Sequence, residues 1–119
     1  MKMKTLALFA TLALTGPAFA HDAKNIHGGR IVFAGNFHVE MVAKNDIIDV
    51  YLIDHNNKQM TLDGYKGLAI LSVDGKSQRI VLEAGDGRLT GKAAGTLPAQ
   101  PKGVVQITPP NGKTVSAKF

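Results

Sequence analysis

The feature that most constrains the fold is the alternation of apolar and polar residues in two neighbouring segments, 37–43 and 47–54. Successive side chains of a β-strand point to opposite faces, so a period of two predicts strands with one buried face. The residues expected on that buried face are Phe37, Val39, Met41, Ile48, Val50 and Leu52. His38 and Glu40 are two residues apart, so we expect both side chains on the opposite face.

The same pattern of strands and turns continues along the chain, and no segment after residue 20 shows a helical period. Asp74 with Gly75 is the strongest hairpin signal. The expected strands span residues 30–34, 37–43, 47–54, 67–73, 78–83, 88–92, 104–108 and 114–119, with a further short edge strand at 59–62. Turns about every eight to twelve residues predict an all-β fold, a single small antiparallel β-sandwich that is immunoglobulin-like in shape. A small β-barrel is the alternative.

Residues 1–20 have the pattern of a secretory signal peptide. Two lysines lie near its start, an apolar stretch at 5–14 follows, and an Ala-x-Ala cleavage pattern occupies 18–20. The apolar stretch is well short of the roughly 20 residues that span a bilayer, which disfavours a membrane anchor. We therefore expect export to a bacterial periplasm, cleavage after Ala20, and a mature β-domain at 21–119 that is not embedded in the membrane.

The amino-acid composition argues against several kinds of site and partner. The chain contains no cysteine, which excludes disulfides, thiolate metal ligands and a cysteine nucleophile. The formal net charge is +5, and it falls to +3 when the two lysines of the predicted leader are removed. The remaining charges are scattered singly, without the clustered basic residues and aromatics of a nucleic-acid surface, so no nucleic acid is expected as a partner.

Four side chains near the start of the predicted mature chain are candidate metal ligands: His21, His27, His38 and Glu40. Imidazole nitrogen is a common ligand of copper, zinc and nickel, and a carboxylate can join such a set. Cleavage after Ala20 would give His21 a free α-amine beside its imidazole, and the two groups together can chelate one copper ion. We therefore expect a bound copper ion, with zinc and nickel as alternatives.

Each of these residues also has an ordinary structural explanation. If the first hairpin turns through residues 34–36, Arg30 falls opposite Glu40, and the two would form a surface ion pair. His38 would then be an ordinary polar residue, and His27 would serve only in a turn or a hydrogen bond.

Three other features have weaker implications. The pair Gly28 and Gly29 allows a sharp bend or a close approach of the backbone to a neighbour. His55 follows Asp54 in a polar turn, where we expect a solvated loop rather than a second metal site. Met60 is a candidate soft ligand for Cu⁺, but we expect it to fill the core.

No catalytic motif is recognisable in the sequence. It has no G-x-S-x-G nucleophile elbow, no H-E-x-x-H zinc helix, no phosphate loop and no dinucleotide fingerprint. The carboxylates are scattered through turns, and no pair of them is fixed by spacing. We therefore expect a protein that is not an enzyme.

Three stretches carry a resemblance to known proteins: residues 27–29 (HGG), 37–42 (FHVEMV) and 50–54 (VYLID). They resemble small exported proteins of bacterial heavy-metal resistance clusters and the N-terminal β-domain of periplasmic adaptor (membrane fusion) subunits of heavy-metal efflux pumps. The resemblance covers the first half of the predicted mature chain and implies an all-β fold and a link to metal handling. The helical hairpin and barrel domains of a full adaptor are absent from this sequence.

A histidine at the mature N-terminus of a small exported β-domain is also similar in strategy to periplasmic copper-resistance carriers. Those carriers have a downstream Asp-x-His pattern, whereas this chain has His38-x-Glu40. Residues and resemblance together predict an exported periplasmic protein that buffers or delivers copper or another divalent transition metal in metal resistance and efflux. The alternative is a non-enzymatic interaction module that binds a component of a heavy-metal efflux system.

Overall fold

The computed structural model describes residues 26–119 and shows an all-β domain. Its eight strands are β1 (Arg30–Ala34), β2 (Phe37–Lys44), β3 (Ile47–Ile53), β4 (Lys66–Val73), β5 (Lys76–Gly85), β6 (Arg88–Lys92), β7 (Lys102–Thr108) and β8 (Val115–Lys118). Within the described residues there is no helix with the length and apolarity needed to cross a membrane. The predicted signal peptide at 1–20 lies outside the described part of the chain.

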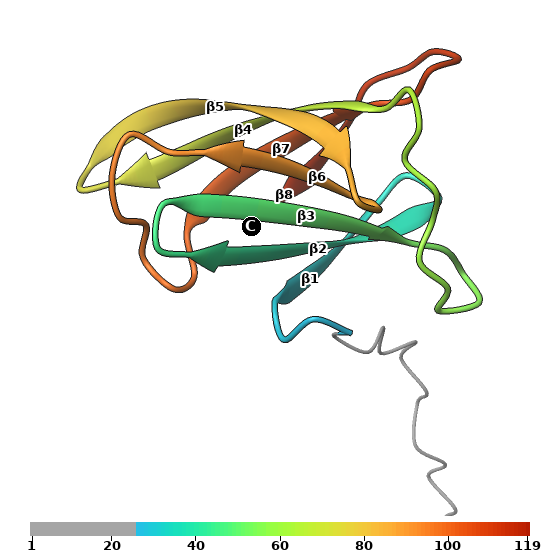
Figure 1. Ribbon diagram of the computed structural model, residues 1–119, viewed down its shortest axis with the longest axis horizontal. Coiled ribbons are helices and arrows are strands. Elements are labelled where there is room, and N and C mark those ends of the chain that lie inside the picture. Colours follow the sequence, from blue (N-terminus) through green and yellow to red (C-terminus); the bar gives the residue numbers. More distant parts are fainter. Residues whose placement is uncertain (1–25) are drawn as a thin grey trace, which may run out of the picture.

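All eight strands form one antiparallel sheet, in the order β1-β2-β3-β6-β5-β4-β7-β8 (Figure 1). Two meanders, β1–β2–β3 and β4–β5–β6, are joined where β3 pairs with β6. Strands β7 and β8 then extend the second meander beyond β4. The sheet curls until its edge strands β1 and β8 come into contact, although no hydrogen-bonded ladder joins them within the described residues.

The predicted all-β class and the antiparallel pairing are confirmed. Of the two architectures that the sequence left open, the observed one is nearer to the barrel, because all strands are continuous in a single, nearly closed sheet. Alternation determines which face of a strand is buried, but it does not determine which strands become neighbours.

The core lies on the concave face of this sheet. Every residue predicted for the buried face of the two alternating segments is buried: Phe37, Val39, Met41, Ile48, Val50 and Leu52. The other large buried side chains come from the second meander and β7, and they include Leu71, Leu82, Leu89 and Ile107. A core assembled from all parts of the sheet makes the eight strands one packing unit.

The turns explain most of the chain reversals. Asp74 and Gly75 both have positive φ, 52° and 76°, as the predicted two-residue hairpin turn requires. Asp86 and Gly87 repeat this arrangement between β5 and β6, with φ of 52° and 76°. The predicted edge strand at 59–62 was wrong: only one isolated bridge, between Ile53 and Gln59, is present there.

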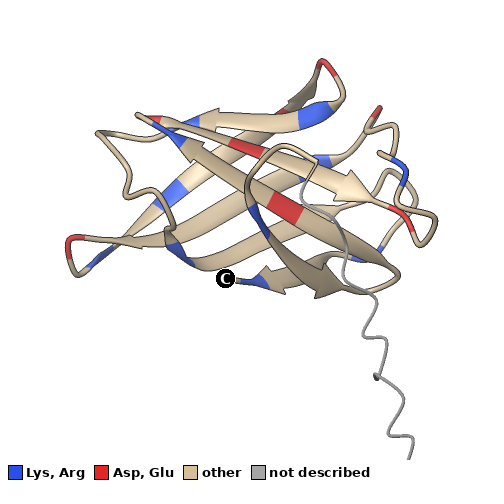
Figure 2. Ribbon diagram, turned by 90° about the horizontal axis from the view of Figure 1, so that it is seen from below, with Lys and Arg blue, Asp and Glu red and all other residues tan. Residues whose placement is uncertain are grey.

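Charged side chains of both signs are interspersed over the strands and turns (Figure 2). One ion pair links neighbouring strands, with Arg88 Nε donating to Asp49 Oδ1 at 3.1 Å. The negative charge of Asp49 raises the pKa of Arg88 above its ordinary value.

Candidate functional site

The most unusual side chain in the fold is Glu40, a carboxylate on the outer face of β2 that has no exposed surface. It lies between Ile31 of β1 and Tyr51 of β3 in the register of the sheet. Glu40 is the only polar or charged side chain classed as fully buried among residues 26–119. A carboxylate is rarely removed from water unless hydrogen bonds or a counter-charge replace its hydration.

The chain before β1 supplies those hydrogen bonds. Glu40 Oε1 contacts the backbone nitrogen of His27 at 3.2 Å and His27 Nδ1 at 3.0 Å. Glu40 Oε2 accepts from the backbone N–H groups of His27 at 3.0 Å and Gly29 at 2.8 Å. Both carboxylate oxygens are thus engaged by N–H donors, as an ionised carboxylate requires.

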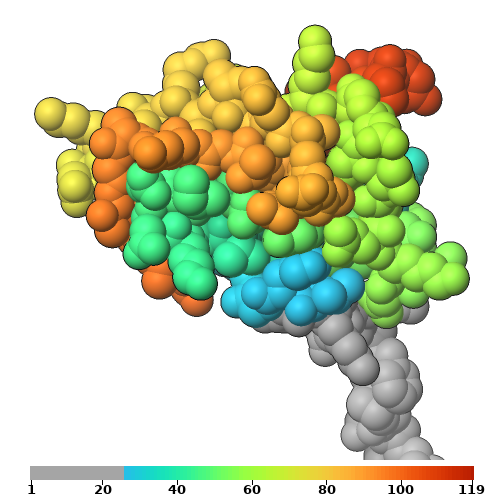
Figure 3. Space-filling model, in the orientation of Figure 1, coloured from blue at the N-terminus to red at the C-terminus, as the bar shows by residue number. Residues whose placement is uncertain are grey.

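The segment 27–29 can cover Glu40 only because glycine is present. A Cβ at Gly29 would overlap the carbonyl oxygen of Met41 and lie 2.7 Å from Val42 Cγ2. Gly28 has a φ of 74°, which turns the chain toward the sheet. The predicted bend and close approach at this pair are confirmed. Figure 3 shows the start of the described chain, in blue, lying against the strands drawn in green.

The imidazole of His27 is held on two sides. Its ring stacks on Tyr51, with centroids 3.5 Å apart and planes inclined by 7°. With Glu40 as a carboxylate, which can only accept, the tautomer of His27 that completes this hydrogen bond carries its proton on Nδ1. In the neutral ring the lone pair is then on Nε2, which has no hydrogen-bond partner among residues 26–119. About a quarter of the side chain is exposed (26%).

This arrangement has a chemical use. A histidine that binds a metal through one ring nitrogen usually donates the other N–H to a carboxylate or carbonyl, which fixes its tautomer and orientation. Glu40 and His27 have that relationship. The carboxylate itself is too buried, and too fully hydrogen-bonded, to reach an ion while the segment 27–29 remains in place.

The three predicted ligands that lie within residues 26–119 are therefore not brought together as one cluster. His27 and Glu40 are in direct contact, whereas His38 lies in the next row of the sheet, opposite Phe33 and Ile53. His21 lies outside the described residues. Within residues 26–119 there is no group of three or more His, Asp or Glu side chains arranged to hold a metal.

The alternative ion pair between Arg30 and Glu40 was wrong. The hairpin turns through Gly35 and Asn36 alone, so the register places Arg30 opposite Met41 and Ile31 opposite Glu40. A shift of one residue moves a side chain to the other face of the sheet. The partner of Glu40 is consequently the preceding backbone and not a cross-strand cation.

A second group of rings lies at the end of the same outer face. Phe33 meets His38 edge to face, with centroids 5.2 Å apart, and meets His55 at 6.4 Å. The Phe33 side chain is mostly exposed (61%). His38 Nδ1 is buried and has no hydrogen-bond partner among the described residues.

The weaker candidates have structural roles. Asp54 caps the turn that contains His55, because its Oδ1 accepts the backbone N–H groups of Asn56 and Lys58, each at 2.9 Å. Met60 packs against the hydrophobic core, as expected.

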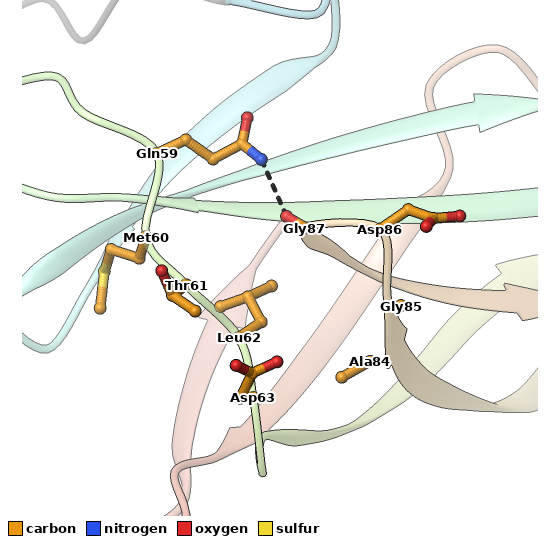
Figure 4. A pocket seen from close by; sticks show the side chains of 9 residues that line it. All are labelled: Gln59, Met60, Thr61, Leu62, Asp63, Ala84, Gly85, Asp86 and Gly87. Carbon is orange, nitrogen blue, oxygen red and sulfur yellow. Dashed lines mark hydrogen bonds between the residues drawn. The ribbon is translucent and has the colours of Figure 1, made fainter.

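Met60 also borders an open pocket of about 250 Å³ between residues 59–63 and the turn at 84–87. Gln59 Nε2 closes one side of this pocket by donating to the Gly87 carbonyl at 2.9 Å (Figure 4). The Met60 side chain points away from the turn in this view. The pocket therefore brings no ligating sulfur toward its acidic residues.

Sequence reasoning missed two partners. Alternation along residues 47–54 puts Tyr51 on the outer face, but its position beside Glu40 depends on the pairing of β2 with β3. The contact of Phe33 with His38 follows only from the register of the β1–β2 hairpin, which puts the two residues opposite each other.

No protein-family model matches this chain, and neither a curated protein nor a solved structure matches it.

Proposed function

We propose that this chain is an exported periplasmic protein that binds copper, or another divalent transition metal, and buffers or delivers it in metal resistance or efflux. The observation that carries the proposal is the contact between buried Glu40 and His27 Nδ1, which leaves Nε2 as the ligating nitrogen. In this proposal Glu40 orients the ligand instead of binding the ion.

His21 would complete the site. After cleavage at the predicted position, its α-amine and imidazole form a chelating pair, and His27 is only six positions further along the chain. An extended chain of that length spans about 20 Å, which is enough to return the terminus to His27 Nε2. The ordered backbone at 27–29 reduces the conformational entropy that metal binding would otherwise have to offset.

The decisive titration uses protein that begins at His21 and adds Cu²⁺ while binding is followed by calorimetry. We expect one ion per chain. His27→Ala, and a form with one glycine added before His21, should each bind about tenfold or more weakly, because each loses a nitrogen ligand or the chelating amine. Asn56→Ala, which removes no candidate ligand, is the matched control and should retain the affinity of the unaltered protein. Absence of saturable binding at micromolar Cu²⁺, or equal affinity in all four forms, would contradict the proposal.

A protein-interaction module of an efflux system is the second candidate. It is favoured by the exposure of Phe33 on the edge strand β1 and of Ile26 ahead of that strand. Apolar side chains at a sheet edge are common anchors for partner proteins. If the titration shows no metal binding, this second function is the one that the exposed residues support.

A further inference from the structure

The rings of Phe33, His38 and His55 converge from three consecutive parts of the sheet. Phe33 is near the end of β1, His38 is the second residue of β2, and His55 lies in the turn after β3. The Phe33 ring meets His38 on the adjacent strand β2, and it also meets His55 in the turn beyond β3, on the other side of β2.

His38 Nδ1 is the one buried side-chain nitrogen or oxygen without a hydrogen-bond partner among residues 26–119. Its surroundings are apolar, since its cross-strand neighbours are Phe33 and the fully buried Ile53. Nearly all buried polar atoms of folded proteins are paired, so an unpaired one marks a place where a partner is missing. A cation that coordinates imidazole nitrogen would give this atom its missing partner.

The backbone of the turn that carries the exposed His55 is held by hydrogen bonds. Asp54 accepts two backbone N–H groups from the turn, and the Asp54 backbone N–H donates to the Lys58 carbonyl at 2.9 Å. The same hydrogen bonds occupy Asp54 Oδ1. The site therefore offers neutral nitrogen donors and an aromatic ring.

These donors favour a monovalent, polarisable cation over a divalent one. The cost of bringing an ion into apolar surroundings rises with the square of its charge, and no carboxylate among the three rings compensates it. Imidazole binds copper well, and a cation within about 6 Å of an aromatic ring centroid is attracted by the ring.

We propose that Phe33, His38 and His55 form a second site, independent of His27, that binds one Cu⁺ ion through the two imidazoles beneath the Phe33 ring. Ag⁺ is the probe for this site, because it has the same charge and closed-shell configuration and is stable in air. The site would let the protein hold the reduced ion separately from Cu²⁺ near His27.

The test adds Ag⁺ to the His27→Ala protein, so that the first site is already removed, and follows the imidazole signals of His38 and His55 by NMR. We expect one bound Ag⁺ and shifts in both rings. Adding His55→Ala should weaken binding about tenfold or more, and Phe33→Leu should weaken it less. Asn56→Ala, in the same turn, is the matched control and should bind like His27→Ala alone. Thermal melts establish that each variant is folded.

Two outcomes overturn the inference: no shift in the His38 ring on adding Ag⁺, or an affinity that His55→Ala leaves unchanged. The result is separable from the proposed function. If only the Cu²⁺ titration fails, the site at His27 is disproved and the ring site remains. If only the Ag⁺ titration fails, the ring site is disproved and the site at His27 remains.

Discussion

At the scale of single residues, Glu40 determines how the start of the described chain is attached to the sheet. Alternation along β2 correctly predicted that its side chain points away from the core, and that prediction favoured an exposed carboxylate. Burial of Glu40 comes from a segment eleven to thirteen residues earlier in the sequence. The only local signal for this contact was the pair Gly28 and Gly29, which lets the backbone approach a neighbour closely but does not indicate which residue that neighbour is.

Gly29→Ala tests that attachment. Its Cβ would overlap the backbone of Met41, so either the sheet distorts or the segment 27–29 lifts and leaves Glu40 buried with fewer donors. We expect a loss of about 1–3 kcal/mol in the free energy of unfolding, measured by urea denaturation. Gly95→Ala is the control, because nothing lies within 4 Å of a Cβ there. Equal stability of the two variants would show that the close approach does not matter.

At the scale of elements, the hairpins were predictable where both turn residues require positive φ. Asp74 with Gly75 is such a pair, and the β4–β5 hairpin forms around it. The β1–β2 hairpin was harder, because a turn of two or three residues around Gly35 fits the sequence equally well. That one-residue difference decided whether Arg30 or Ile31 faces Glu40, and hence the expected ion pair.

Gly75→Ala tests the contribution of the β4–β5 turn. Alanine at a φ of 76° is strained, and there is no nearby atom that would clash with the added Cβ. We expect a destabilisation of about 1–2 kcal/mol from the backbone alone, measured as a shift in the urea midpoint. Asp74→Asn should be close to neutral, since Asn-Gly suits the same turn. A neutral Gly75→Ala would mean that the turn conformation differs in solution.

At the scale of the whole molecule, the sequence predicted the all-β class, the separate strands and their buried faces. It did not predict the strand order, in which β3 pairs with β6 and β4 pairs with β7. Those pairings join distant parts of the chain, and period-two patterns carry no information about them. The two ring sites depend instead on the pairing of β2 with β1 and with β3, which brings His27 to Tyr51 and Phe33 to His55.

We propose that signal cleavage creates half of a copper site whose other half is His27, held by Glu40. Native mass spectrometry of the protein recovered from the periplasm, with and without added Cu²⁺, tests it most directly. We expect a chain that begins at His21 and gains the mass of one copper ion. A chain that begins elsewhere and binds copper equally well, or a chain that begins at His21 and binds none, would contradict it.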